Sequence, residues 1–73
     1  MLWLIAHHSL LLLVGSKVRA IRKAQKISLR ELGKLCSLDY GHLSRLENGS
    51  QVTHILTLKR IADVLNVDLK DLI

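Results

Sequence analysis

Two short helical patterns meet between Ser28 and Gly49, and the first of them begins with a capping box. In this motif the Ser28 hydroxyl accepts a hydrogen bond from the backbone N–H of Glu31, and the Glu31 carboxylate accepts one from the N–H of Ser28. Apolar or small residues follow at spacings of three and four, at Leu29, Leu32, Gly33 and Cys36. Because residues at these spacings share one face of a helix, the pattern predicts an amphipathic helix that begins at Ser28.

The second pattern follows a short interruption at Ser37 and Leu38. Asp39 is suited to cap a new helix, because its side chain can accept from a free backbone N–H of the first turn. Leu43 and Leu46 would form the buried side of that helix. The two patterns together predict a helix-turn-helix whose second helix covers about residues 40–47.

Helical periodicity continues on both sides of this motif. Gly15 and Ser16 are interpreted as a helix break followed by a cap, which predicts a helix over about 17–25. Apolar residues at three- and four-residue spacing predict a longer helix over 55–65.

The C-terminal end adds one more turn. Asp68 is suited to cap a turn over 69–73, in which we expect Leu72 and Ile73 to be exposed. Leu, Ile and Val are abundant, whereas the chain has no Pro and no Phe. The sequence therefore predicts an all-α fold of five helices, to which the N-terminal segment could add an extra helix.

The length and the cysteine content indicate a single small domain without an internal disulfide. Its 73 residues make one small domain, and domains of this size bury only about 60% of their unfolded surface, so that a second copy would add stability. The single cysteine, Cys36, excludes an internal disulfide and falls on the apolar face of the first motif helix. We interpret it as a small buried hydrophobic residue in a reducing cytoplasm.

The net charge of +5 comes from one part of the chain. Residues 16–47 hold eight basic side chains, Lys17, Arg19, Arg22, Lys23, Lys26, Arg30, Lys34 and Arg45, against three acids, Glu31, Asp39 and Glu47. From Asn48 onward, three basic side chains balance three aspartates. A basic excess around a helix-turn-helix is expected if the motif faces a phosphate backbone, and the alternative is a solvated basic face without a partner.

The segment over residues 1–14 is apolar and has no charged side chain. It falls short of the roughly 20 residues that span a bilayer, and the basic residues follow it, unlike those of a secretory signal. Three interpretations stay open: a helix packed on the domain or on a dimer partner, a disordered or artefactual extension, and a membrane-surface anchor. We divide the chain into an apolar extension, 1–15, and a helix-turn-helix domain, 16–73, and expect a cytoplasmic protein without a membrane partner.

The chain shows no candidate metal site or catalytic group. His7 and His8 would point about 100° apart on a helix, so we do not expect them to share a metal ion. The remaining Ser, His and Cys residues show no nucleophile, base and orienting group in a common pattern. We therefore expect neither an enzyme nor a cofactor.

The residues of the motif and of the following helix resemble those of the Cro/repressor-like (XRE-type) helix-turn-helix proteins of bacteria and phages. The resemblance covers about residues 16–73 and rests on Leu32, Gly33, Leu38, Asp39, Leu43, Arg45, Leu46, Glu47, Asn48, Gly49, Leu58, Ile61, Ala62, Leu65, Val67, Leu69 and Leu72. Three positions depart from the family pattern: Gly33 replaces the usual Ala, Ser37 the usual Gly of the turn, and Thr53 a common Pro. None of these changes removes a contact group.

The resemblance implies an ion pair between Arg22 and Glu47. Such a pair would tie the first helix to the end of the second motif helix, which is a structural role. The alternative for Arg22 is a contact to a DNA phosphate.

The resemblance also implies that the second motif helix enters the major groove, where its exposed residues reach base edges. These residues are Tyr40, Gly41, Ser44 and Arg45. We expect Arg45 to contribute most to direct readout, because a guanidinium can bond O6 and N7 of guanine together.

Phosphate contacts would position the domain and supply affinity without sequence information. The candidates are Ser28, Leu29 and Arg30 at a helix start, whose free N–H groups favour an anion, and His42, Ser50, Gln51 and Thr53. Lys17, Arg19 and Lys23 would contribute at longer range.

The sequence thus predicts a sequence-specific regulator of transcription that binds double-stranded DNA. One small unit makes few base contacts, so we expect a homodimer that reads two half-sites. The alternative is an antitoxin-like interaction module whose apolar ends, near residues 1–14 or 69–73, bind a partner protein.

Overall fold

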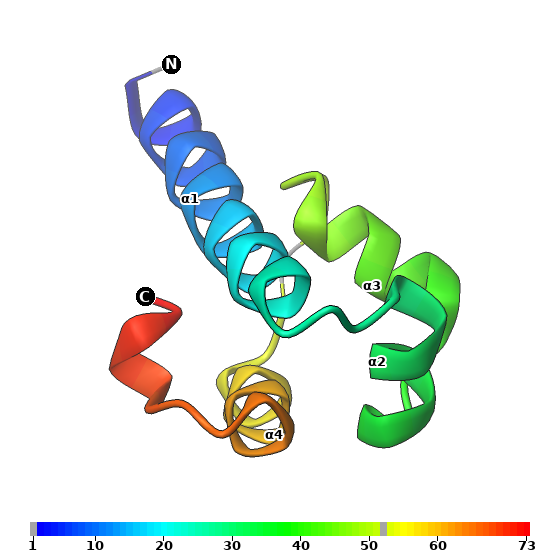
Figure 1. The fold of residues 1–73 in the computed structure, drawn as a ribbon. Helices are drawn as coiled ribbons and strands as arrows, with labels where there is room; N and C mark the ends of the chain where they lie inside the picture. The colour runs from blue at the N-terminus through cyan, green and yellow to red at the C-terminus, as the bar shows by residue number, and fades with distance from the viewer. Residues whose placement is uncertain (1, 52) are drawn as a thin grey trace.

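The computed structural model describes residues 2–51 and 53–73, with side chains from residue 10 onward. It contains four α-helices, α1 (Leu2–Ala24), α2 (Leu29–Cys36), α3 (Tyr40–Glu47) and α4 (Ile55–Leu65), and a short 3-10 helix, η1 (Leu69–Asp71). No β-strand occurs among these residues, so the all-α fold class is confirmed (Figure 1). The side chains of His7 and His8 lie outside the described residues.

The helix break predicted at Gly15 and Ser16 is wrong, because α1 continues through both residues. A glycine inside a helix costs only about 0.5–1 kcal/mol relative to alanine, which does not end a helix that packs well. Ser16 does not cap a new helix either, since its hydroxyl donates to the carbonyl oxygen of Leu13 within α1, at 3.1 Å. The expected N-terminal helix and the helix over 17–25 are therefore one element.

Two glycines explain how α1 crosses the C-terminal end of α3. A Cβ at Gly15 would lie 2.3 Å from the carbonyl oxygen of Leu46 and 2.7 Å from that of Glu47. A Cβ at Gly49 would lie 2.7 Å from a methyl carbon of Leu12, and Gly49 has a positive φ of 71°. Only residues without a Cβ allow this approach, so α1 packs against the end of the helix-turn-helix.

The corner between α2 and α3 forms as its local sequence predicts. The backbone N–H of Glu31 donates to the Ser28 hydroxyl at 3.1 Å, and the N–H of Ser28 donates to the Glu31 carboxylate at 3.4 Å. Ser37 ends α2 in the left-handed region, with φ of 56°, and Asp39 caps α3 by accepting from the N–H of Gly41 at 3.0 Å. The helix-turn-helix is confirmed.

The core lies among α1, α2, α4 and η1, and it includes the side of α3 that turns inward. Its buried hydrophobic members are Val18, Leu32, Cys36, Leu43, Leu46, Leu58, Ile61, Ala62, Leu65 and Leu72. The expectation that Leu72 is exposed is wrong, because η1 returns the chain onto the domain and buries this side chain completely. Ile73 is exposed, as expected.

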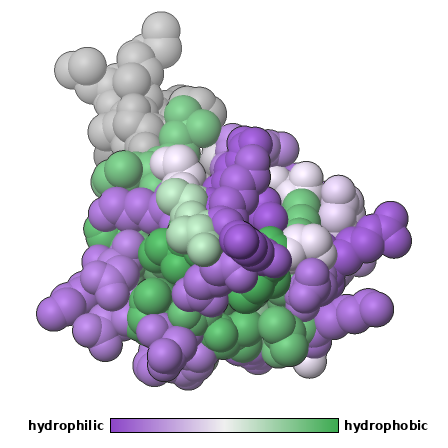
Figure 2. All heavy atoms as spheres, in the orientation of Figure 1, coloured by the Kyte–Doolittle hydropathy of each residue, from purple (hydrophilic) through white to green (hydrophobic). Residues whose placement is uncertain are grey.

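The N-terminal half of α1 extends beyond the rest of the domain (Figure 1). A helix of 23 residues is about 34 Å long, close to the longest extent of the molecule, 36 Å. Within the described residues, no helix has both the length and the hydropathy that crossing a membrane requires. Leu10, Leu12 and Leu13 are exposed on this half, whereas hydrophilic side chains surround the hydrophobic patches on the face drawn in Figure 2.

Candidate nucleic-acid interface

The four residues expected to contact bases lie on α3, away from its buried side. Leu43 and Leu46 pack into the core, while Tyr40 and Arg45 are exposed, and Gly41 and Ser44 are half-buried. This arrangement follows from the helical repeat, because the pairs 40–41 and 44–45 share one face four residues apart. Together they form a continuous surface that a ligand can reach.

The Arg45 guanidinium makes one hydrogen bond to a side chain and lies over Gly41. Its Nε donates to Oε1 of Gln51 at 2.5 Å. Its Nη1 lies 3.1 Å from the position that a Cβ of Gly41 would occupy, so the guanidinium folds back over Gly41. The side chain of Arg45, a predicted base contact, is therefore bonded to the loop that follows α3.

A hydrogen bond extends this arrangement to His42. The Gln51 side-chain nitrogen lies 3.0 Å from Nδ1 of His42. The other ring nitrogen, Nε2, is buried and makes no hydrogen bond within the described part of the chain. One ring nitrogen is therefore engaged inside the protein and the other is shielded from solvent, which gives His42 a role within the protein in this conformation.

From the sequence, His42 and Gln51 were predicted only as phosphate contacts. Their hydrogen-bonded link to Arg45 was not predicted. The three residues share one side of α3 and of the loop that follows it. The only signal in the sequence is the pairing of Arg45 with a glycine four residues before it, which leaves space for a long side chain.

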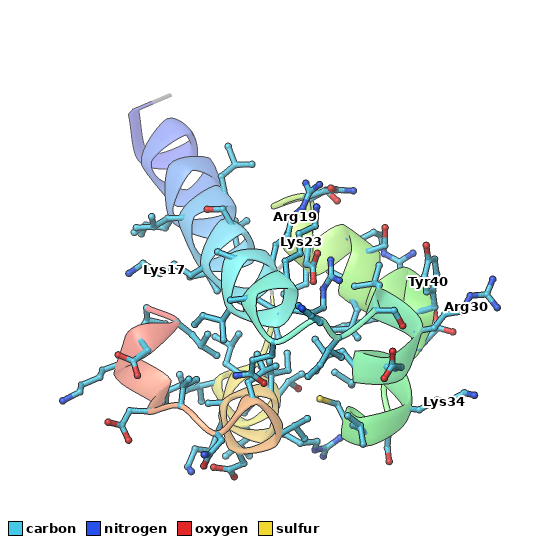
Figure 3. The ribbon with its side chains drawn as sticks, viewed as in Figure 1. Lys17, Arg19, Lys23, Arg30, Lys34 and Tyr40 are labelled. Carbon is cyan, nitrogen blue, oxygen red and sulfur yellow. The ribbon has the colours of Figure 1, made fainter. Side chains whose placement is uncertain are left out.

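The starts of α2 and α3 meet at Arg30 and Tyr40. The guanidinium carbon of Arg30 lies 5.7 Å from the centre of the Tyr40 ring, which is a cation–π contact. Both side chains point away from the core at the same edge of the molecule (Figure 3). A candidate phosphate contact and a candidate base contact are thus adjacent.

The remaining candidate phosphate contacts differ in their exposure. Ser28 is exposed, and Leu29 packs its side chain against the core, so that Leu29 can contribute only its backbone N–H. Ser50 is exposed and its hydroxyl donates to the carbonyl oxygen of Arg45 at 3.2 Å. Thr53 is half-buried, and its hydroxyl oxygen is buried without a partner among the described residues. The structure therefore presents Ser28 and Ser50 to solvent, but not the Thr53 hydroxyl.

The basic side chains of α1 do not share one face. Lys17 points to one side of α1, whereas Arg19 and Lys23 point to the other (Figure 3). The Lys17 ammonium donates to the carbonyl oxygen of Ile73 at 3.1 Å, at the C-terminal end of the described chain. Of the three expected long-range contributors, only Arg19 and Lys23 lie on the side of α1 nearer α3.

Arg22 and Glu47 form a bidentate ion pair between α1 and the end of α3. The Arg22 Nε and Nη2 atoms donate to the two Glu47 carboxylate oxygens at 2.7 and 2.9 Å, and Nη1 donates to the carbonyl oxygen of Ile27 at 2.8 Å. The exposed fractions of the two side chains are only 10% and 6%. The hydrogen bond to Glu47 raises the pKa of Arg22, which keeps the guanidinium charged. Each of the three guanidinium nitrogens of Arg22 is therefore engaged in a hydrogen bond inside the protein, as expected for a structural role.

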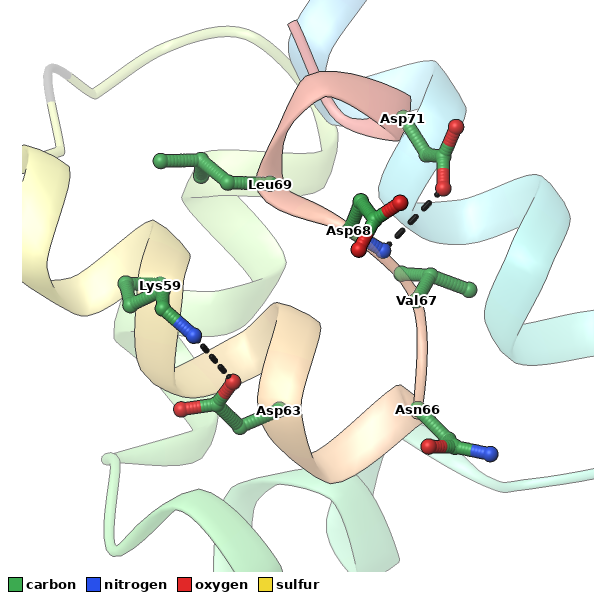
Figure 4. Close-up of a pocket in the computed structure, with 7 residues that line it drawn as sticks. All are labelled: Lys59, Asp63, Asn66, Val67, Asp68, Leu69 and Asp71. Carbon is green, nitrogen blue, oxygen red and sulfur yellow. Dashed lines mark hydrogen bonds and ion pairs between the residues drawn. The ribbon is translucent and has the colours of Figure 1, made fainter.

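A hollow on the other side of α4 has the opposite charge (Figure 4). It is lined by Lys59, Asp63, Asn66, Val67, Asp68, Leu69 and Asp71. Lys59 bonds Asp63 at 2.5 Å, and the Asp71 carboxylate accepts from the N–H of Asp68 at 3.1 Å. Three carboxylates against one ammonium repel phosphate, so this hollow is unsuited to a nucleic acid.

Comparison with solved structures gives the same fold. The restriction-modification controller protein C.AhdI from Aeromonas hydrophila is 24% identical, with a TM-score of 0.87 over 92% of this chain and 97% of its own. The clp gene regulator ClgR from Corynebacterium glutamicum is 27% identical, with a TM-score of 0.83 over 86% of this chain and 67% of its own. An HTH_3 family transcriptional regulator from Vibrio cholerae is 21% identical, with a TM-score of 0.85. That match covers 90% of this chain and 37% of the Vibrio cholerae protein.

A comparison with curated protein sequences returned no match. The helix-turn-helix family profile HTH_3 matches residues 18–72, which include the motif, the Arg22–Glu47 pair and the helices that cover the core. The match begins within α1, so the outer half of this helix lies outside it. The chain therefore belongs to the HTH_3 family of helix-turn-helix proteins.

Proposed function

We propose that this helix-turn-helix protein is a transcriptional regulator that recognises a specific double-stranded DNA sequence by inserting α3 into the major groove. The observation that carries the proposal is the outward face of α3, where Arg45 and Tyr40 are exposed and backed by buried leucines. A major groove admits one α-helix, and the side chains of Gln51 and Arg30 lie beside Arg45 and Tyr40 on this face. ClgR, which is 27% identical, is described as a regulator of clp genes, and this agrees with a role in gene regulation.

The charges around α3 support the same orientation on DNA. Arg30, Lys34 and Lys23 are exposed around the helix-turn-helix, while the carboxylates of the α4 hollow lie away from it. Cations placed around a recognition helix release counterions from the phosphates, which supplies affinity that does not depend on sequence. In this proposal Ser28, Arg30 and Ser50 contact phosphates, and α3 contacts bases.

The proposal includes a homodimer. A single eight-residue recognition helix covers one half-site, and two-fold dimers of such domains read two half-sites about one helical turn apart. Leu10 and Leu13 are three residues apart on α1 and are 58% and 47% exposed. Exposed apolar surface of this kind is typical of protein interfaces, and we assign it to the second copy.

The same leucines favour one alternative, in which the chain binds a different protein through α1, as an antitoxin would. Burial of Leu72 leaves Ile73 as the exposed large hydrophobic side chain at the C-terminal end, so this end offers less apolar surface than α1 does. The outer half of α1, with Leu10, Leu12 and Leu13 exposed, is the larger candidate surface. Binding of a partner there would leave α3 free, so both functions could coexist.

Selection of bound sequences from a random pool of duplex DNA tests the proposed function. We expect the wild-type protein at about 0.15 M salt to enrich one motif with two-fold symmetry. The Arg45→Ala variant, as a matched control, should enrich a weaker motif. Retention of all sequences alike by the wild-type protein would exclude sequence-specific regulation and favour the protein-interaction module.

A further inference from the structure

We propose that Gln51 is a positioning residue that fixes the Arg45 guanidinium for base recognition, and that His42 fixes Gln51 in turn. The proposal rests on the proposed function, because it assumes that Arg45 reads a base. Its new element is a chain of hydrogen bonds, called the relay below, that runs from Arg45 on α3 through Gln51 in the following loop and back to His42 on α3.

The chemistry of the three groups determines the direction of the relay. A guanidinium only donates hydrogen bonds, so the Gln51 atom at 2.5 Å from Arg45 Nε must be its amide oxygen. The amide nitrogen then faces His42 Nδ1 at 3.0 Å and donates to it. Nδ1 can accept only when it carries no proton. The relay therefore requires the His42 tautomer that has its proton on Nε2.

The relay also determines which donors of Arg45 remain for DNA. Gln51 occupies Nε, and Gly41 leaves the space in which Nη1 lies. Nη1 and Nη2 together form the outer fork of the guanidinium, which matches the O6 and N7 acceptors of guanine. The arrangement thus favours a bidentate contact to guanine through Nη1 and Nη2. A bidentate contact through Nε and one Nη atom is unavailable, because Nε is bonded to Gln51.

Fixing Arg45 before DNA binds lowers the ordering cost of recognition. An exposed arginine has several rotatable bonds, and immobilising such a side chain on binding reduces affinity. A side chain that is already in the required orientation avoids that loss at the specific site. Non-specific complexes, in which Arg45 meets no guanine, gain nothing from this orientation. The relay should therefore increase the preference for the specific site over other DNA more than it increases the affinity for DNA in general.

The His42 environment is consistent with a functional origin of the relay. Its Nε2 is buried and makes no hydrogen bond to the described residues, and in the tautomer that the relay requires this atom is a donor. A buried donor without an acceptor is unfavourable for folding. An apolar side chain at position 42 should therefore leave stability equal or higher, while removing the acceptor that orients Gln51.

Three variants separate positioning from a phosphate contact. Gln51→Met keeps the length of the side chain but removes the amide, and His42→Leu removes the acceptor for that amide. Ser50→Ala is the matched control, because it changes the neighbouring loop residue without touching the guanidinium. The readout is the ratio of affinities for the selected site and for the same site with its guanine replaced by adenine. Thermal unfolding followed by circular dichroism verifies that each variant is folded.

We expect Gln51→Met and His42→Leu to lower this ratio by about 2- to 10-fold, which corresponds to the ordering of one long side chain. Ser50→Ala should weaken binding to both sites alike and leave the ratio unchanged. In the Arg45→Ala background, Gln51→Met should have no further effect on the ratio. His42→Leu should not lower the melting temperature, which distinguishes positioning from structural support.

A second measurement tests the relay without DNA. In the free protein, the Arg45 Nε–H resonance should be shifted and protected from solvent exchange, and Gln51→Met should abolish both effects. An unprotected Nε–H in the wild-type protein would overturn the relay even if the protein binds DNA specifically. The relay is also wrong if Arg45→Ala lowers the ratio but Gln51→Met does not. If the wild-type ratio is close to one, the proposed function fails instead.

Discussion

Gly15 of α1 approaches Leu46 of α3 so closely that a Cβ on the glycine would lie 2.3 Å from the Leu46 carbonyl oxygen. Both partners in this contact are backbone atoms, so neither can move without displacing a helix. We expect Gly15→Ala to destabilise the protein by about 1–3 kcal/mol, a typical cost of overpacking, although alanine favours a helix by about 0.5–1 kcal/mol over glycine. Urea unfolding followed by circular dichroism measures the difference.

Ser16→Ala provides the matched control for Gly15→Ala. Ser16 is exposed on the same helix, so its replacement should change stability by no more than about 0.5 kcal/mol. If Gly15→Ala instead raised stability, as in a solvent-exposed helix, α1 would not cross α3 at this point.

The Arg22–Glu47 pair should behave as one unit in a double-mutant cycle. Removal of one partner leaves a charge in a site where the side chains are 10% and 6% exposed, which typically costs about 3–5 kcal/mol. Arg22→Ala and Glu47→Ala should each lower the free energy of unfolding, and the double variant should lose less than the sum of both. Arg19→Ala, on an exposed part of α1, is the control. Additive losses would mean that the two charges are independent in solution.

Arg45→Ala and Arg30→Ala should have different effects on DNA binding. Loss of a bidentate base contact removes about 1–3 kcal/mol of discrimination, so Arg45→Ala should weaken binding to the selected site more than to random DNA. Loss of a phosphate contact should weaken both alike and reduce the salt slope by about 1, as expected for Arg30→Ala. Fluorescence anisotropy over a salt series measures these effects. Equal losses on both DNAs for Arg45→Ala would identify it as a phosphate contact.

The exposed leucines of α1 should determine the oligomeric state. We expect the double variant Leu10→Gln, Leu13→Gln to shift the protein toward monomer in sedimentation and to weaken binding to a two-fold site. Binding of one domain to random DNA should change little, because α3 is not altered. Leu56→Gln is the control, since Leu56 is 69% exposed on a different helix. A double variant that stays dimeric would exclude this part of α1 as the interface.

Cys36 should make stability depend on pH on the alkaline side. Burial raises the pKa of its thiol, and the charge of Arg60 opposes this effect only in part. The folded thiol keeps its proton to higher pH than the unfolded thiol, whose pKa is about 8.5. The contribution of the Cys36 thiol to the free energy of unfolding is therefore complete below about pH 8.5, and it declines as the pH rises above that value.

Urea unfolding of the wild-type protein and of Cys36→Ala at pH 7 and pH 9.5 measures this contribution. The wild-type protein should lose more stability between the two pH values than the variant does. Equal losses would show that the thiol is accessible to solvent in the folded protein.

The sequence by itself determined the helix-turn-helix and the outward face of α3. Ser28 with Glu31, and Asp39 with Gly41, form their capping bonds within three residues of each other, so local sequence is sufficient to place these helix starts. The same holds for the buried side of α3, because a helical repeat assigns faces without reference to the rest of the chain. The Arg22–Glu47 pair spans 25 residues, and it was expected only through the resemblance to a family.

Tertiary structure decided the features that depend on surfaces brought together from distant parts of the chain. Gly15 resembles a helix break in sequence, but the backbone of α3 determines that it is a contact point inside α1. Leu72 lies near the end of the chain, and only the return of η1 onto the domain buries it. The link from Arg45 through Gln51 to His42 joins a helix to a loop through side-chain atoms. Such contacts depend on the position and direction of atoms in space, which residue spacing along the chain does not specify.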